Sequence, residues 1–318
     1  MKKLFKWIHR CLLAIAAILH RFHAICKRRK HKGCPCEPPA SLPLDVPDPL
    51  IYDQYYLMSL GLAVTWDNPD IRLRLGGVVV NPSDLQENTE YQIFARIWNS
   101  SPNAPVAGLP VVFQYLQYGI GTQPIPIGTT TQTTVDLGVL GQPPAVAVVN
   151  WTTPSTPGHY CIQVHLEPFD DSNFNNNLGQ LNTHVVTAQS PAVSAFALRN
   201  DSRVRRMFTF EADSYFVGEP PPCGPPESPF AGSRRTGRAT IPQRHLYGSQ
   251  PLPEGWSVQF EPTNPTLDPG EQITLTASVV PPVGYHGQQT VNLNAFAPAE
   301  FTGKRALAGG VTLTVIVP

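Results

Sequence analysis

Residues 88–116 read NTEYQIFARIWNSSPNAPVAGLPVVFQYL, and this stretch decides the fold class. Every second residue from Tyr91 to Ile97 is apolar, which is the two-residue period of a strand with one face in a core. A break rich in Asn, Ser and Pro follows at residues 99–105, and the apolar run at 109–116 resumes as a second strand. A pair of strands of this kind, echoed at residues 157–166, predicts a β-sandwich.

The composition also favours an all-β chain. The chain has 318 residues, of which 35 are Pro and 24 are Gly, and only 14% are charged. It is therefore rich in turn-forming residues and poor in those that fill surface helices. Its length is sufficient for two domains, because single cores stop growing well below twice the usual domain size.

We expect two Ig-like β-sandwich domains preceded by a basic amphipathic N-terminal helix and a Pro-rich linker. Alternating apolar patterns restart after Pro191, and a Pro- and Arg-rich stretch interrupts them. That stretch cannot form a core and should be a mobile loop. The predicted segments are the helix at 1–32, the linker at 33–50, the first sandwich at 51–190, and the second sandwich at 191–318 with its insertion at 218–253.

The N-terminal arm is strongly basic. Residues 1–32 hold ten of the 23 basic residues and no acidic one, which leaves a formal charge of about −10 on the remainder. Apolar residues spaced three and four apart form one helical stripe, but the longest apolar run is only nine residues, about half of a bilayer span. We therefore expect the helix to lie in an anionic membrane interface. The residues predicted to contact the membrane are Lys2, Lys3, Lys6, Arg10, Ile15, Ile18, Phe22, Arg28 and Arg29.

Two other interpretations of this arm stay open, a helix-pairing seam and an atypical export signal. His20, Arg21 and His23 follow the apolar run, where a cleavable signal peptide would have small residues. We therefore expect no cleavable signal, and we expect the protein to be associated with a membrane or the cell envelope.

Three segments carry a family resemblance. They are ARIWNSSPNAPVAGLPVVFQY, WTTPSTPGHYCIQVHL and DDSNFNNNLGQLNTHVV, and together they span roughly residues 70–190. They resemble the Ig-like module called the cell-adhesion-related bacterial domain (CARDB). The resemblance implies a seven-stranded sandwich that serves as a binding or spacer module, mostly in extracytoplasmic proteins.

A second resemblance covers about residues 250–318. The string LPEGWSVQFEPTNPTLDPGEQITLTASVVPP is similar to the Ig-like modules attached to some bacterial α-galactosidases, in particular at Gly255-Trp256 and at residues 268–271. This similarity implies a second sandwich. The catalytic domains of those glycosidases are absent from the string, so no hydrolase activity follows from it.

Two stretches of the first sandwich are candidate ligand sites. The aromatic residues Tyr52, Tyr55, Tyr56 and Trp66 precede the first strong strand; they could stack on a sugar or simply cover the edge of the sandwich. Calcium binds six to eight oxygens, and a hairpin loop offers several, although its Asn and Asp residues also suit turn dihedrals. The loop residues are Asp170, Asp171, Asn173, Asn175 and Asn177.

Two candidate zinc sites have fewer suitable ligands than the calcium loop. Cys34 and Cys36 lack a second pair of ligands at zinc-finger spacing. His165 and His184 are nearly symmetric about the hairpin loop and are expected to face each other across it, but zinc needs at least one more donor. Apart from calcium, no cofactor is expected.

The sequence predicts a binding protein and not an enzyme. It contains no nucleophile elbow, phosphate-binding Gly-rich loop or zinc-protease motif. We expect a non-catalytic binding or structural module that recognises a protein or glycan and meets an anionic membrane through its arm. The alternative is an accessory carbohydrate-binding protein that uses the Tyr52–Trp66 segment. A weaker alternative is nucleic-acid contact through the arm and the basic residues at 234–244.

Overall fold

The computed structural model describes residues 46–82, 85–128, 133–155, 159–187, 191–214 and 251–318. The predicted N-terminal helix with its membrane residues, the Cys34 and Cys36 pair and the insertion as far as residue 250 lie outside the described residues. Within the described ranges, no helix is long and apolar enough to cross a membrane. The described residues belong to one compact unit.

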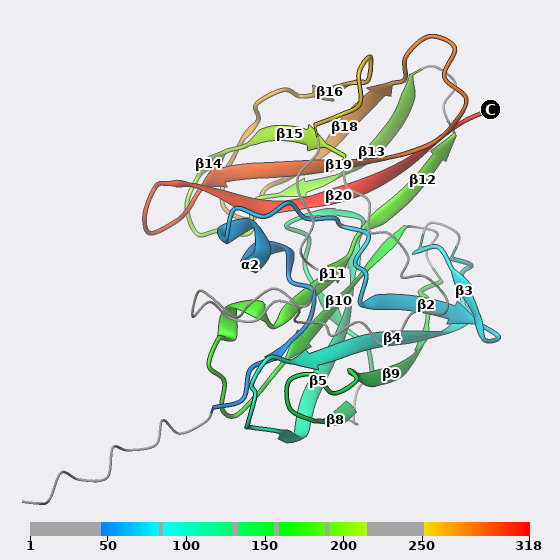
Figure 1. Cartoon of the computed structure of the whole chain (residues 1–318). Helices are drawn as coiled ribbons and strands as arrows, with labels where there is room; N and C mark the ends of the chain where they lie inside the picture. Colours follow the sequence, from blue (N-terminus) through cyan, green and yellow to red (C-terminus); the bar gives the residue numbers. More distant parts are fainter. Residues whose placement is uncertain (1–45, 83–84, 129–132, 156–158, 188–190, 215–250) are drawn as a thin grey trace, which may run out of the picture. The chain divides into compact units, whose positions relative to one another are not determined.

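The fold is an all-β sandwich fold, as predicted (Figure 1). Helical segments among the described residues include α2 (Gln54–Ser59) and the 3-10 turn η2 (Phe174–Asn176). One sheet of the N-terminal half holds β1 (Pro49–Leu50), β2 (Ile71–Leu75), β3 (Val78–Val80), β4 (Glu90–Asn99) and β9 (Ala145–Thr152). The other sheet holds β5 (Val106–Gln117), β7 (Ile125–Pro126), β8 (Thr133–Leu137), β10 (Tyr160–Leu166) and β11 (Leu178–Leu181).

The remaining strands form two four-stranded sheets and one short ribbon. The first sheet holds β12 (Thr183–Thr187), β15 (Thr209–Asp213), β19 (Gly287–Pro298) and β20 (Arg305–Val317). The second holds β6 (Gly119–Ile120), β13 (Ala192–Arg199), β16 (Ser257–Glu261) and β18 (Gln272–Val280). The ribbon pairs β14 (Arg206–Met207) with β17 (Thr266–Leu267).

The two strands of the 88–116 stretch do not pair with each other. β4 pairs with β1, β2 and β9, whereas β5 pairs with β7, β8 and β10 in the opposite sheet. The chain crosses between the sheets at Asn99, whose side chain accepts from the Ser101 N–H at 3.0 Å and donates to the carbonyl oxygens of Ala104 and Gly138 at 2.8 and 2.9 Å. The sequence therefore predicted both strands correctly, but the break between them is an arch and not a hairpin.

The predicted alternation builds the first core. Tyr91, Ile93, Ala95 and Ile97 of β4 are all buried, while Gln92 and Arg96 between them are exposed. They pack with inward residues of both N-terminal sheets, which are Ile71, Leu73, Leu109, Val111, Phe113, Trp151, Ile162, Val164 and Leu166. This sheet-on-sheet packing is the arrangement expected for a sandwich.

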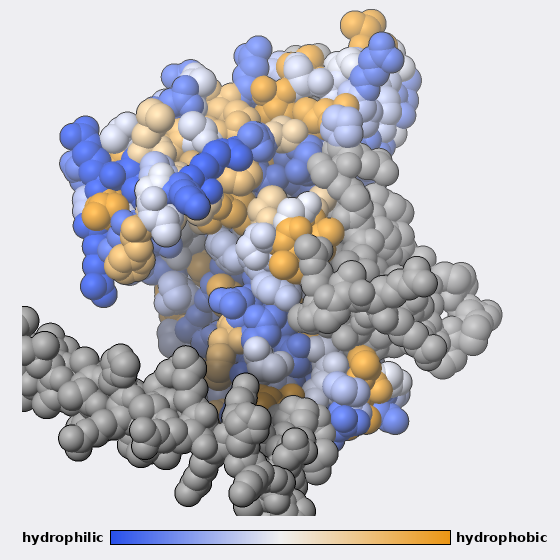
Figure 2. All heavy atoms as spheres, turned by 60° about the vertical axis from the view of Figure 1, so that its left-hand side comes forward, coloured by the Kyte–Doolittle hydropathy of each residue, from blue (hydrophilic) through white to orange (hydrophobic). Residues whose placement is uncertain are grey.

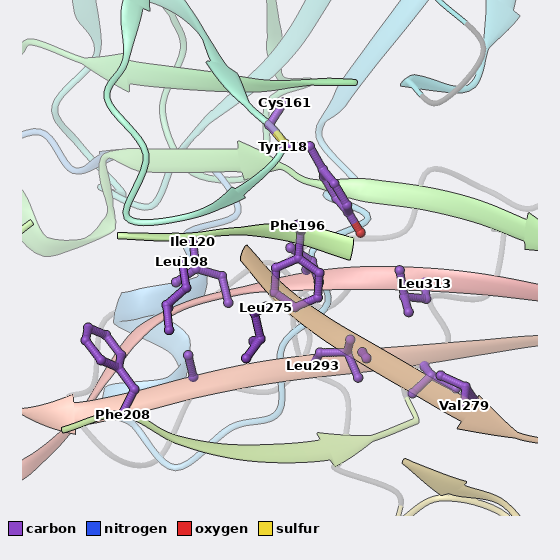
Figure 3. Packing of buried hydrophobic residues seen from close by; sticks show 14 of the residues in the cluster. Tyr118, Ile120, Cys161, Phe196, Leu198, Phe208, Leu275, Val279, Leu293 and Leu313 are labelled. Carbon is purple, nitrogen blue, oxygen red and sulfur yellow. The ribbon is translucent and has the colours of Figure 1, made fainter. Parts of the chain in front are cut away.

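The second core includes residues from both halves of the chain. Its centre is built from alternating residues such as Leu275, Val279, Leu293 and Leu313, as the sequence predicted (Figure 3). Tyr118, Ile120 and Cys161, which precede the predicted boundary at residue 190, also belong to it. The boundary itself stays a prediction.

The sequence pattern predicts one strand at residues 181–187 that pairs with the strand at 159–166, but the structure divides this stretch between two sheets. Leu178–Leu181 pairs with β10, whereas Thr183–Thr187 pairs in parallel with β20. The change occurs at Asn182, whose Nδ2 donates to the carbonyl oxygens of Gly119 at 2.9 Å and Gly310 at 2.6 Å. The single hairpin partner predicted for residues 159–166 is therefore wrong beyond Leu181, because this buried amide holds the chain at the crossing point.

Candidate interaction surface

The aromatic segment is mostly part of the interior. Tyr52 and Trp66 are both 0% exposed, and the Tyr52 hydroxyl accepts a hydrogen bond from the Thr65 N–H at 2.9 Å. Tyr55 is partly buried and packs edge-on against Trp66 with ring centres 5.9 Å apart, and Tyr56 is also partly buried. Two of the four rings are therefore closed off from any ligand, so stacking on a sugar, one of the two interpretations of this segment, is wrong for Tyr52 and Trp66.

A buried polar network surrounds Trp66 instead. Its backbone N–H donates to Thr312 Oγ1 at 2.8 Å and its indole N–H donates to Asn294 Oδ1 at 2.9 Å. The side chains of Asn292 and Asn294 each donate to Asp213, at 2.8 and 3.0 Å. Burial raises the pKa of Asp213, and the two amides oppose that rise. The network joins the lead-in segment to strands β19 and β20.

The predicted calcium loop uses oxygens of Asp171 and Asn173 in internal hydrogen bonds. Asp171 accepts from the Asn173 N–H at 2.8 Å and from the Asn177 amide at 2.7 Å, and Asn173 accepts from the Asn175 N–H at 3.3 Å. Asp170 is exposed. These are Asx-type turns of a kind that stabilise a loop without a metal. Calcium binding here stays a prediction.

The two histidines of the hairpin do not face each other. His165 lies opposite Leu178 in β11 and is exposed. His184 lies in β12, where its ring centre is 4.7 Å from that of His159 and 5.5 Å from that of Tyr118. No group of three or more His, Cys, Asp or Glu side chains that could hold a metal ion occurs in the ranges that the structure describes.

One sheet carries an outward surface of unusual composition. Strands β3, β2, β4 and β9 lie side by side (Figure 1), and their outward side chains line up in rows set by the register. We call these nine residues the outer face. The first row is Val79, Arg74, Gln92 and Asn150, the second is Arg72, Phe94 and Val148, and the third is Arg96 and Val146.

The outer face exposes apolar side chains where an antiparallel sheet usually presents polar ones. Val79 is 54% exposed, Val146 50% and Val148 37%. The Arg74 guanidinium lies 4.2 Å from the centre of the Phe94 ring, a distance at which a cation is attracted to the ring. Arginine and apolar side chains therefore form one continuous surface across four strands.

Three arginines give the outer face a positive charge. Arg72 forms an ion pair with Asp67, whose carboxylate is 3.9 Å away, and an exposed pair at that distance contributes little. Glu90 lies at the start of β4 and is exposed. Since the chain beyond the arm carries a formal charge of about −10, the outer face is a basic and apolar region on an acidic body.

Apolar exposure alone does not define this surface. Figure 2 shows hydrophobic and hydrophilic residues interspersed over another side of the molecule, and single exposed residues such as Val193 and Phe301 occur elsewhere. Scattered exposed residues are normal on a soluble domain. The outer face differs because its apolar residues are register neighbours of three arginines.

The outward positions of Arg72 and Arg74 follow from the alternation in residues 71–75, but the surface they belong to was not predicted. The sequence does contain one indication of this surface. In residues 145–152, which read AVAVVNWT, the apolar residues Val146 and Val148 occupy alternate positions that would point outward. Only the register shows that Val148 lies beside Phe94.

Comparisons with known proteins give no family for this chain. No family model and no curated protein matches it. Similar solved structures include WR4, an MSP family member of C. elegans (12% identity, 43% of this chain, 92% of that chain, TM-score 0.22). Others are the E. coli alpha-2-macroglobulin activated by porcine elastase (10%, 80% and 23%, 0.23) and the CupB6 tip adhesin of Pseudomonas aeruginosa (8%, 79% and 98%, 0.23). Likenesses at these TM-scores carry no argument about function.

Proposed function

We propose that this protein is a non-catalytic binding module of a membrane-associated or cell-envelope assembly, and that it binds a protein partner through the outer face. The single observation that supports this most is the run of Val146, Val148 and Phe94 beside Arg72, Arg74 and Arg96. Arginine and aromatic residues are enriched at protein interfaces. Contiguous exposed apolar surface is a common mark of an interaction site.

The partner should be an acidic protein surface that also carries apolar residues. The three arginines attract carboxylates, and the valines supply area that becomes buried on contact. Attraction between exposed charges is screened by salt. Binding should therefore weaken as ionic strength rises, without disappearing, since the apolar contact remains.

A rigid support suits such a role. The outer face lies on a sheet whose inner side is filled by Ile71, Leu73, Ile93 and Ala95, each 0% exposed. Buried hydrogen bonds from Trp66 also hold the lead-in segment of this sheet to Thr312 and Asn294. Side chains on such a support are held in place before a partner arrives, which lowers the entropy cost of binding.

A pair of matched substitutions tests the proposal. Val148→Asp places a carboxylate beside Phe94 on the outer face, and Val193→Asp makes the same change on β13, where Val193 is 55% exposed. In pull-downs from the cells that make the protein, the full chain and V193D should retain the same partner and V148D should lose it. Equal retention by both variants would argue against the outer face.

The membrane part of the proposal is tested separately, because it concerns the N-terminal arm. The full chain should sediment with membranes and bind vesicles that contain anionic lipid, while a chain lacking residues 1–32 should do neither. Equal distribution of the two chains would remove the arm from the proposal without affecting the outer face.

A further inference from the structure

A cavity of about 380 Å³ lies between strands of the two halves of the chain, away from the outer face. Its walls come from the turn at Gly119–Thr122, from β10 and β11, from the loop after β13 and from the middle of β20. Ligand pockets for small molecules have volumes of roughly 300–1,000 Å³. The cavity is therefore large enough for a small ligand.

The polar groups around the cavity both donate and accept hydrogen bonds. Gln163 and Gln180 are opposite each other in the register of β10 and β11, and both line the cavity together with Tyr55 and Thr122. A side-chain amide offers two donors and two acceptor sites, and a hydroxyl offers one donor and two acceptor sites. Such a mixture is suited to hydroxyl groups, which also act both ways.

Gln163 is the most informative of these residues. It is 9% exposed and lines the cavity from β10, with Gln180 opposite it in the register of β11. Its amide offers two donors and two acceptor sites. An amide on a cavity wall can therefore bind a polar ligand through both kinds of hydrogen bond.

An ion pair adds a second polar group. Arg206 donates to Asp201 at 2.5 Å and to Asn200 Oδ1 at 3.0 Å, and its side chain is only 11% exposed while that of Asp201 is 55% exposed. Asp201 and Arg206 both line the cavity. The fixed guanidinium leaves a carboxylate oxygen of Asp201 available to accept from a ligand hydroxyl.

Apolar residues complete the wall. Ile120, Leu178 and Leu307 line the cavity beside the polar groups, and Ile120 is 2% exposed. A ligand that carries hydroxyls around its edge and C–H groups on its faces would satisfy both kinds of wall.

From this arrangement we propose that the cavity binds a saccharide, a single sugar unit or the end of a chain, chiefly through hydrogen bonds and not through ring stacking. Of the aromatic segment, Tyr55 contributes its hydroxyl, which is hydrogen-bonded to Gln180. This site is independent of the outer face, and binding at one does not require the other.

The test uses Gln163→Leu, which keeps most of the side-chain volume and removes every polar atom. The control is Gln114→Leu, because Gln114 is the register neighbour of Gln163 on β5 but does not line the cavity. Binding of glucose, galactose, mannose, N-acetylglucosamine and glucuronate to the full chain is measured by saturation-transfer NMR and titration. Melting temperatures of all variants show whether they are folded.

We expect at least one of these sugars to bind the full chain and Q114L equally, and to bind Q163L at least tenfold more weakly. Tyr55→Phe, which removes a single hydroxyl, should also weaken binding and serves if Q163L does not fold. If none of the five sugars binds the full chain, or if Q163L and Y55F bind as well as the full chain does, the saccharide site is wrong. Neither result would affect the test of the outer face with V148D.

Discussion

The indole N–H of Trp66 donates a hydrogen bond of 2.9 Å to Oδ1 of Asn294, which lies 228 residues further along the chain. Both side chains are buried, with exposed fractions of 0% and 2%. Gly310 is packed directly on the indole, because a Cβ at that position would collide with Trp66 Nε1. The lead-in to the first sheet is thus part of the structure that holds β19 and β20.

Removing the Trp66 donor should destabilise the protein. In Trp66→Phe, Asn294 Oδ1 loses its donor, and a buried acceptor without a partner costs about 1–3 kcal/mol. Trp256→Phe is the control, because Trp256 is also buried, at 8% exposure, but its indole N–H donates to no described residue. We predict that W66F lowers the free energy of unfolding in urea by about 1–3 kcal/mol more than W256F does. Equal losses would show that the hydrogen bond contributes nothing.

The amide of Asn182 should be equally important at the crossing between β11 and β12. Asn182→Ala removes three hydrogen bonds, the two donated to the carbonyl oxygens of Gly119 and Gly310 and the one accepted from Cys161 Sγ, and should cost about 1–3 kcal/mol. Asn150→Ala removes an exposed amide that contacts only Gln92 among described residues, at 3.3 Å, and should change stability by less than about 0.5 kcal/mol. Thermal or urea unfolding compares the two, and a loss in N150A as large as that in N182A would contradict this role.

His159 should make stability depend on pH. Burial, with His184 close by, lowers its pKa from 6.5 to about 3, so the unfolded chain binds more protons than the folded one between these values. The stability contributed by neutral His159 therefore falls as pH drops below 6.5, with a slope of at most about 1.4 kcal/mol per pH unit.

The comparison with His159→Phe isolates this effect. A phenyl ring can keep the stacking on Tyr118, where the His159 ring centre is 4.0 Å away, but it cannot take up a proton. Asp53, whose pKa burial raises to about 7, has the opposite pH dependence in both proteins and cancels from the difference. From pH 7 to pH 5, H159F should become steadily more stable relative to the unmodified chain. Parallel stability curves would show that His159 does not titrate in this way.

Local pattern was sufficient to predict the strands. Residues such as Ile93 in β4 and Leu275 in β18 lie in regular alternation, and each is buried on the side that the alternation predicted. The pattern fixes which side chains are buried, because a shift of one residue would move every apolar side chain of the strand from the core to the solvent.

Pairing between distant segments could not be read from the sequence. Gly119–Ile120 pairs in parallel with Ala197–Leu198 of β13. A strand of two residues is too short to carry a sequence pattern that predicts its partner. The sequence left open whether Trp66 meets a ligand or covers the sandwich, because aromatic residues suit both surfaces and cores. Its burial and its contact with Asn294 show that it is a core residue. The outer face was not predicted for a related reason, since it can be recognised only when the register of four strands is known.

The most direct test of the proposed function is site-specific photo-crosslinking from the outer face. A photoreactive amino acid replaces Val148 in one full-length chain and Val193, the exposed valine on β13, in another, and both are irradiated in the cells that make the protein. We predict a discrete adduct with an acidic protein from position 148 and none from position 193. No adduct from position 148, or the same adduct from both positions, would contradict the proposal that the protein acts through this face.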